Sequence, residues 1–168
     1  MSARGPERAT ASPRTDWVTP QPLFDLLDRE FRFTLDAAAS DANHKCERYL
    51  TEAENALAAL PFGEVIWLNP PYGRLGEWVQ RVRDWSIAGN TVVVLLPANT
   101  DTGWFSSVWY AADEIRFMYR RVQFVGGGNS NTGGSMVAVY RPHPRGHGTW
   151  TGTPPRVSLW DWRAEAQP

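Results

Sequence analysis

The stretch Val65-Ile66-Trp67-Leu68-Asn69-Pro70-Pro71-Tyr72 decides the fold expected for this 168-residue chain. Its four apolar residues, closed by two prolines, predict a short buried strand with a rigid end, because proline fixes φ and lacks a backbone N–H. The residue before each proline is also kept out of helical geometry. Residues 74–88 then have the pattern of a helix. In open α/β sheets, such a turn lies at the carboxyl edge, where these folds bind ligands.

The polar groups of this turn suit an amine that is conjugated with an aromatic ring. Because its lone pair is delocalised into the ring, such an amine is a poor nucleophile. The side-chain oxygen of Asn69 and the carbonyl oxygen of Pro70 could accept its two N–H groups and steer the nitrogen toward sp³ character. Tyr72 could stack on the ring, a contact worth roughly 1–3 kcal/mol. A proline-rich turn without chemistry is the alternative.

Length and composition predict one folded domain. The chain has 42% hydrophobic residues and a net charge of −1, so no overall positive charge indicates nucleic acid. It has no apolar run of about 18 residues, and residues 1–14 have the composition of a disordered leader, not of a signal peptide. Cys46 is the single cysteine, which excludes an internal disulfide and favours a reducing cytoplasm. No cluster with metal-ligand spacing is found.

The positive side chains are almost all arginine, and Lys45 is the only lysine. Guanidinium groups bind phosphates and base edges in a planar, forked geometry. Codon usage in a GC-rich genome would produce the same bias. Both explanations stay open.

The remaining pattern alternates between helices and strands. Helices are expected at residues 20–31, 74–88 and 104–109, and strands at 33–36, 65–68, 91–97, 114–119 (extended by 120–124) and 135–140. Residues 15–142 would form the domain, and the Trp- and Pro-rich residues 143–168 a tail that packs on it or serves an interface. The glycine-rich stretch 126–134 joins two strands, so it predicts a hairpin connection and not a phosphate loop.

Two further positions precede the central stretch. Thr19 is expected to be the N-cap of the first helix, with Pro20 at its first position. The strand at 33–36 ends in Asp36 and small residues, where a backbone can approach a ligand closely; a helix N-cap is the alternative role for Asp36 or Ser40. Because Asp36 and Asn69 lie close in the sequence, little room remains for strands between them.

Several short motifs follow one another in a defined order. They are Trp17-x-Thr19-Pro20, Leu35-Asp36-x-Ala38-Ala39-Ser40, Asn69-Pro70-Pro71-Tyr72, Leu95-Leu96-Pro97-Ala98, Arg121-x-x-Phe124 and, after the glycine-rich hairpin, Arg141-Pro142. In this order they resemble the phage-type DNA N6-adenine methyltransferase family over residues 15–142. The resemblance implies an α/β fold, namely an abbreviated Rossmann-like S-adenosylmethionine-dependent methyltransferase fold with a mixed sheet and a C-terminal β-hairpin.

The resemblance also implies an activity. It implies methyl transfer from S-adenosylmethionine to N6 of a flipped adenine in double-stranded DNA, by direct displacement, by a phage or prophage protein in the cytoplasm of a bacterial host. The catalytic residues would be Asn69, Pro70, Pro71 and Tyr72. The cofactor-binding residues would be Thr19, Pro20, Asp36, Ala37, Ala38 and Asn69. The DNA-binding candidates are Tyr72, Arg74, Arg120, Arg121 and Asn129.

Other functions share parts of this pattern. The Asn-Pro-Pro-Tyr tetrad also occurs in enzymes that methylate RNA bases or glutamine amides of proteins, because those nitrogens are conjugated too. A non-catalytic nucleic-acid-binding relative would retain the fold and fail to bind S-adenosylmethionine. The Gly-x-Gly usual after the first strand is absent here, so the exact cofactor contacts stay open.

Overall fold

The computed structural model describes residues 17–125, 133–142 and 153–166. Six strands form one sheet in the order β1-β2-β3-β5-β4-β6. They are β1 (Leu35–Asp36), β2 (Val65–Leu68), β3 (Thr91–Pro97), β4 (Glu114–Met118), β5 (Ser135–Tyr140) and β6 (Arg156–Trp160). Strand β5 runs antiparallel to its neighbours β3 and β4, and the other pairs are parallel. The mixed sheet and its antiparallel β4–β5 pair confirm the predicted fold class.

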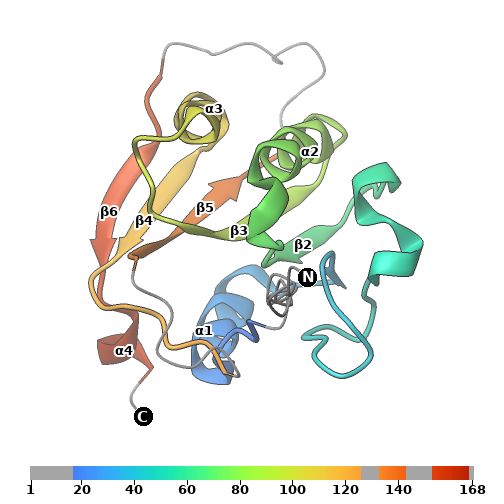
Figure 1. The fold of residues 1–168 in the computed structure, drawn as a ribbon, viewed down its shortest axis with the longest axis horizontal. Coiled ribbons are helices and arrows are strands. Elements are labelled where there is room, and N and C mark those ends of the chain that lie inside the picture. The colour runs from blue at the N-terminus through green and yellow to red at the C-terminus, as the bar shows by residue number, and fades with distance from the viewer. Residues whose placement is uncertain (1–16, 126–132, 143–152, 167–168) are drawn as a thin grey trace, which may run out of the picture.

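Helices cover both faces of this sheet. The structure contains α1 (Gln21–Phe31), α2 (Leu75–Ile87), α3 (Gly103–Ala111) and α4 (Trp162–Glu165), with the 3₁₀ turns η1 (Glu52–Glu54), η2 (Ala56–Ala58) and η3 (Tyr72–Arg74). Figure 1 shows α2 and α3 on one face, and α1 and α4 on the other. In the described part of the chain, every helix is too short or too polar to cross a membrane.

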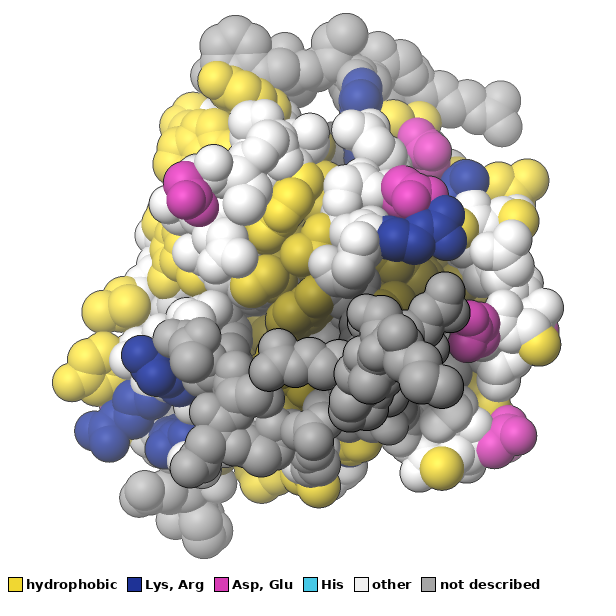
Figure 2. Space-filling model, viewed as in Figure 1, with side chains coloured by type: hydrophobic (Ala, Val, Ile, Leu, Met, Phe, Trp, Pro, Cys, Tyr) yellow, Lys and Arg dark blue, Asp and Glu magenta, His cyan; other side chains and the backbone are white. Residues whose placement is uncertain are grey.

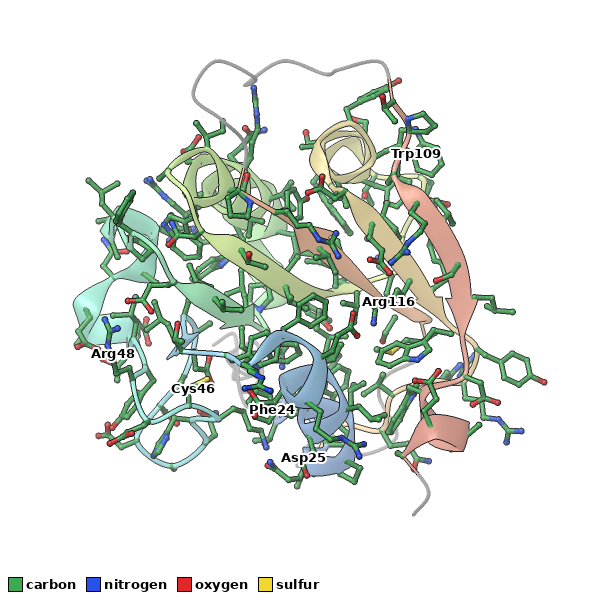
Figure 3. All side chains as sticks on the ribbon, turned by 180° about the vertical axis from the view of Figure 1, so that it is seen from behind. Phe24, Asp25, Cys46, Arg48, Trp109 and Arg116 are labelled. Atoms are coloured by element: carbon green, nitrogen blue, oxygen red, sulfur yellow. The ribbon has the colours of Figure 1, made fainter. Side chains whose placement is uncertain are left out.

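The alternation of side chains along β3 divides the core into two layers. Val92, Val94 and Leu96 pack on the side of α2 and α3, whereas Val93 and Leu95 pack on the side of α1. Because both faces are covered, the strand is apolar throughout. Figure 3 shows Phe24 pointing from α1 toward the sheet and Asp25 pointing away.

The sheet is abbreviated, as predicted. Strand β1 pairs directly with β2, with Leu35 opposite Ile66 and Asp36 opposite Trp67. Between β1 and β2 the chain forms only turns, a bridge of Tyr49 to Asp36, and η1 and η2. The chain therefore passes from the turn after Asp36 to Asn69 without entering the sheet as another strand.

The prediction that residues 120–124 extend the fourth strand is wrong. Strand β4 ends at Met118, and residues 119–125 leave the sheet. The alternating apolar residues Val122 and Phe124 are buried in the layer of α1, and neither belongs to a strand. Val125 then forms an isolated bridge with Val18.

The prediction of Thr19 as an N-cap is also wrong. Helix α1 begins after Pro20, and no side chain caps its N-terminus. The hydroxyl of Thr19 is instead bound to Asn69.

Residues beyond 142 contribute to the sheet. Within the stretch expected to be a tail, Arg156–Trp160 forms β6, which pairs in parallel with β4. Helix α4 follows and packs against α1. Trp160 and Trp162 are buried in the same layer. The leader predicted at residues 1–14 and most of the glycine-rich connection lie outside the described residues.

Candidate active site

The carboxyl ends of three parallel strands meet at one edge of the sheet. Strands β1, β2 and β3 end at Asp36, Leu68 and Pro97, and they run in the same direction. The antiparallel β5 begins at this edge, because Ser135 pairs with Pro97. Asp36 and the Asn-Pro-Pro-Tyr tetrad therefore lie at the same edge of the sheet.

The side chain of Asn69 is oriented by the segment that precedes α1. Its Nδ2 donates to the carbonyl oxygen of Trp17 at 2.8 Å and to Oγ1 of Thr19 at 3.2 Å. A carbonyl oxygen only accepts, so the amide nitrogen must face Trp17 and Oδ1 must point elsewhere. No donor from the described residues contacts Oδ1. Since Asn69 is partly exposed, its amide presents an acceptor at the end of β2.

The two prolines after Asn69 fix the direction of the chain. Pro70 is buried and Pro71 is exposed. Pro71 has φ −62° and ψ 130°, which is extended backbone, and η3 begins directly after it. Because proline restricts its own φ and the residue before it, the Asn69 side chain and the Pro70 carbonyl lie on a rigid support.

Aromatic rings surround Tyr72. Its ring packs edge-on against Trp17, with centroids 5.2 Å apart, and Trp17 stacks on Phe124 at 5.3 Å. The Tyr72 hydroxyl and Trp17 Nε1 are buried without a hydrogen-bond partner. Burial raises the pKa of the Tyr72 hydroxyl, which keeps it neutral. Unpaired buried polar atoms cost about 1–3 kcal/mol each, and the side chains of Tyr140, Asp161 and Trp162 also carry one.

Asp36 is a buried carboxylate at the same edge. It is 3% exposed, and its two oxygens accept the backbone N–H groups of Ala38 (3.3 Å) and Lys45 (3.0 Å). Burial raises the pKa of this carboxyl group, although these hydrogen bonds oppose the shift. Ala37 is buried, and its N–H donates to Trp67. No helix begins at residues 37–50, so a helix-cap role for Asp36 or Ser40 is wrong.

The candidate DNA-binding residues have different surroundings. Arg74 forms an ion pair with Glu77, which compensates its charge. Arg120 and Arg121 are exposed, and the Arg120 guanidinium lies 5.4 Å from the centre of the Tyr119 ring. Asn129 lies outside the described residues.

A cysteine side chain and a metal ion are two other groups that could supply chemistry at this edge of the sheet. Cys46 is 7% exposed, and burial raises the pKa of its thiol to about 12, so it does not supply a thiolate nucleophile at neutral pH. Among the described residues, no group of three or more His, Cys, Asp or Glu side chains could hold a metal ion.

Sequence reasoning missed two parts of this site. The Trp17 carbonyl binds a side chain 52 residues away, and no residue pattern marks a backbone acceptor. The ring of Phe124 stacks on Trp17, although Phe124 follows β4 and Trp17 precedes α1. The motifs Trp-x-Thr-Pro and Arg-x-x-Phe contain both residues, so their common presence was the available signal.

Comparisons with known proteins identify the family of the chain. The mixed sheet covered by helices on both faces is that of a Rossmann-like methyltransferase fold. A family model described as DNA N-6-adenine-methyltransferase (Dam) matches residues 8–157, and two phage proteins of that name are similar to the chain. This chain belongs to the DNA N-6-adenine-methyltransferase (Dam) family.

The two relatives differ in how much of them is matched. The protein of Escherichia phage T1 is 34% identical over 101 residues, which are 59% of this chain and 42% of that protein. The protein of Haemophilus phage HP1 is 34% identical over 121 residues, which are 70% of this chain and 68% of that protein. The match thus spans less than half of the T1 relative. A solved structure, a predicted O-methyltransferase (Atu636) of Agrobacterium tumefaciens, covers 90% of this chain and 83% of its own at 10% identity, with a TM-score of 0.41.

Proposed function

We propose that this chain transfers a methyl group from S-adenosylmethionine to N6 of adenine in double-stranded DNA, in the cytoplasm of a bacterial host. The observation that carries the proposal is the orientation of the Asn69 amide. Its nitrogen is bound to Trp17 and Thr19, so its oxygen is left to accept a hydrogen bond from an amine. The rigid Pro70–Pro71 turn holds that acceptor in place.

The corner would activate the amine by geometry. Asn69 Oδ1 and the Pro70 carbonyl oxygen would each accept one N–H group of N6, which steers the nitrogen toward sp³ character and localises its lone pair on the nitrogen. The partly exposed ring of Tyr72 would contact the face of the adenine. Holding the nitrogen in this orientation lowers the entropic part of the barrier.

A duplex adenine must leave the base stack to reach this corner, at a cost of a few kcal/mol (on that order). The Tyr72 hydroxyl and Trp17 Nε1 have no partner of their own, and a bound base could supply acceptors for them. Satisfying such groups and stacking on the aromatic rings would offset the cost of flipping.

The turn after β1 suits the cationic methyl donor. When bound, S-adenosylmethionine supplies an electrophilic methyl group on a positively charged sulfur. Asp36 is buried, and burial raises the pKa of its carboxyl group, so a positive charge beside it favours the carboxylate. Ala37 and Ala38 would let the donor approach the backbone. Thr19 and Pro20 would border the same edge, although the Thr19 hydroxyl is engaged by Asn69.

The test is a methylation assay with the purified chain and S-adenosylmethionine. The acceptors are duplex DNA, RNA of the same sequence and a glutamine-containing peptide, and the products are identified by mass spectrometry. We expect N6-methyladenine in the duplex, and a loss of turnover on the order of 10²-fold in Asn69→Ala. Gln80→Ala, which removes an exposed amide of α2, is the matched control. Near-normal turnover by Asn69→Ala, or methylation of RNA or peptide alone, would contradict the proposal.

A further inference from the structure

Three arginines lie on two adjoining segments, the segment after β4 and helix α4. Arg120 and Arg121 are exposed, and Nη2 of Arg163 on α4 donates to the carbonyl oxygen of Arg121 at 3.0 Å. None of the three forms an ion pair with a carboxylate of the described residues. Figure 2 shows Lys and Arg side chains gathered at the lower left, where Figure 1 has α4, with no Asp or Glu side chain visible among them. We call these three residues the arginine surface.

This surface is unusual for the molecule as a whole. The net charge of the chain is −1, and many of its other arginines are paired: Arg48, Arg74, Arg81, Arg116, Arg141 and Arg156 each lie beside a carboxylate. Uncompensated cations that lie together create a local positive potential, which favours a polyanion.

A groove runs beside the arginine surface. It has a volume of about 320 Å³ and is lined by Pro20, Pro22, Gln123, Trp162, Arg163 and Ala166. The guanidinium of Arg163 lies 5.4 Å from the centre of the Trp162 ring, which limits its motion. Pro20, one of the lining residues, directly follows Thr19, whose hydroxyl binds the Asn69 amide.

The arginine surface is also connected to the aromatic part of the site. Phe124, three positions after Arg121, stacks on Trp17, and Trp17 contacts Tyr72. Three residues span at most about 10 Å. The ring contacts from Phe124 to Trp17 and on to Tyr72 add centroid spacings of 5.3 and 5.2 Å to this length.

We propose that the arginine surface binds phosphates of the DNA strand that flanks the target adenine. The proposal rests on DNA being the substrate, and it assigns to α4 a direct role in substrate binding. Guanidinium groups form paired hydrogen bonds with phosphate oxygens. Such contacts would hold the flanking strand while its adenine occupies the corner at Asn69 and Tyr72.

The test compares Arg163→Ala, Arg120→Ala and Arg121→Ala with Arg29→Ala. Arg29 is exposed in the last turn of α1, so its removal changes net charge equally. Binding of a fluorescent 20-base-pair duplex is measured by anisotropy at several salt concentrations. For each lost phosphate contact, the slope of log K against log[salt] falls by about 0.9, for all DNA sequences alike. Arg29→Ala keeps the wild-type slope.

Two further measurements separate a phosphate contact from a structural role. Arg163→Lys retains the charge and should keep most of the salt slope. Calorimetry should give unchanged affinity for S-adenosylmethionine in all variants. The KM for DNA should rise in the three alanine variants of the arginine surface. Equal slopes in the wild type and the three alanine variants, or an equal loss in Arg29→Ala, would overturn the proposal.

The outcomes also distinguish this proposal from the proposed function. If the chain methylates DNA but the alanine substitutions leave its salt slope unchanged, the arginine surface is not the strand-binding site. If the chain binds DNA through these arginines without methylating adenine, the surface is upheld and the proposed activity fails.

Discussion

The Asn69 side chain depends on two oxygen atoms from a distant part of the sequence. The carbonyl oxygen of Trp17 would bind the amide nitrogen whatever side chain residue 17 carries, whereas the second acceptor requires a hydroxyl at residue 19. Thr19 is 3% exposed, so a water molecule would not readily replace that hydroxyl. We therefore regard Thr19 as a positioning residue for Asn69 and not primarily as a contact to the methyl donor.

Substitution of Thr19 should separate these two roles. Thr19→Val removes the acceptor at nearly constant volume, and we expect kcat to fall about tenfold, which corresponds to about 1.4 kcal/mol. Thr19→Ser should restore most of the rate, and calorimetry should give wild-type affinity for S-adenosylmethionine. A donor affinity that falls in Thr19→Val and recovers in Thr19→Ser would show instead that the hydroxyl contacts the donor.

The hydroxyl and the ring of Tyr72 should contribute unequally. Because the hydroxyl is buried without a partner, Tyr72→Phe should leave the free energy of unfolding unchanged or higher, by up to about 1 kcal/mol. The rate of DNA methylation by Tyr72→Phe should stay within about tenfold of the wild-type rate. Any decrease would reflect the loss of a hydrogen bond from the hydroxyl to the base. Tyr72→Ala should abolish methylation, since it removes the ring. Urea denaturation and a single-turnover assay measure both effects, and equal rates for the two variants would exclude stacking.

Asp36 predicts a pH dependence of donor binding. Burial raises the pKa of the carboxyl group, so protonation begins at a higher pH than for an exposed aspartate. As the pH falls through this raised pKa, the carboxylate is lost and affinity for the cationic donor should fall. Asp36→Asn should bind the donor at least about tenfold more weakly at pH 7 and show a flatter pH profile. Calorimetry between pH 5 and 8 is the measurement, and an equally steep profile in Asp36→Asn would contradict this role.

At the scale of elements, two irregular segments hold each other in place at the site. Val18 and Val125 exchange both backbone hydrogen bonds, at 3.0 and 3.3 Å. The ring stack of Trp17 on Phe124 lies next to this bridge. The segment after β4 therefore helps to hold Trp17, and through Trp17 it affects the orientation of Asn69. Neither this segment nor the segment before α1 belongs to a strand of the sheet.

Val125→Pro should loosen this bridge. Proline lacks the N–H that donates to Val18, and its loss costs about 1 kcal/mol of local stability. We expect faster amide exchange at residues 17–19 and a lower kcat, with global unfolding almost unchanged. Because the Val125 side chain is 61% exposed, Val125→Thr is the control and should behave as wild type. Unchanged exchange at residues 17–19 in Val125→Pro would disprove the coupling.

The elements differ in how far the sequence could predict them. Strand β3 could be predicted because both its faces are buried, so residues 92–96 are all apolar, and α1 because Leu23, Phe24 and Leu27 recur at helical spacing. Strand β6 could not, since four of its five residues are exposed at the edge of the sheet. The Asn-Pro-Pro-Tyr corner could be located from its prolines, and the roles of its residues stay predictions. Its partner Trp17 could not be foreseen, because a backbone carbonyl carries no residue signature.

At the scale of the whole molecule, one buried carboxylate connects distant parts of the chain. Glu114 on β4 binds Arg116 (2.7 Å) and Arg156 of β6 (2.7 Å), and lies 3.4 Å from Arg141, just after β5. Arg116 also binds Glu30 of α1 and lies between the rings of Phe31 and Trp160. Figure 3 shows Arg116 between α1 and the strands. These bonds join one layer of helices to one edge of the sheet.

The charge of Glu114 should matter only above its folded-state pKa. Burial alone would raise that pKa, but the hydrogen bonds from Arg116 and Arg156 outweigh it and lower it below 4.5. Its stabilising contribution is thus complete above pH 4.5 and is lost as the pH falls through the lowered value. Glu114→Gln should lose roughly 3 kcal/mol of unfolding free energy at pH 7, and this difference should shrink at lower pH. Urea denaturation measures it, and the exposed Glu47→Gln should change stability by less than about 0.5 kcal/mol.

The position of β6 has a consequence for how the protein is made. This strand follows the other five in the sequence, yet it covers the outer side of β4. During translation, the other five strands therefore leave the ribosome before β6. Until β6 is added, the outer edge of β4 has unpaired N–H and C=O groups, which can pair with strands of other chains. A chain truncated after residue 142 would lack β6, so the outer edge of β4 would stay unpaired. We expect this truncated chain to accumulate in inclusion bodies, although it contains the whole Asn-Pro-Pro-Tyr corner.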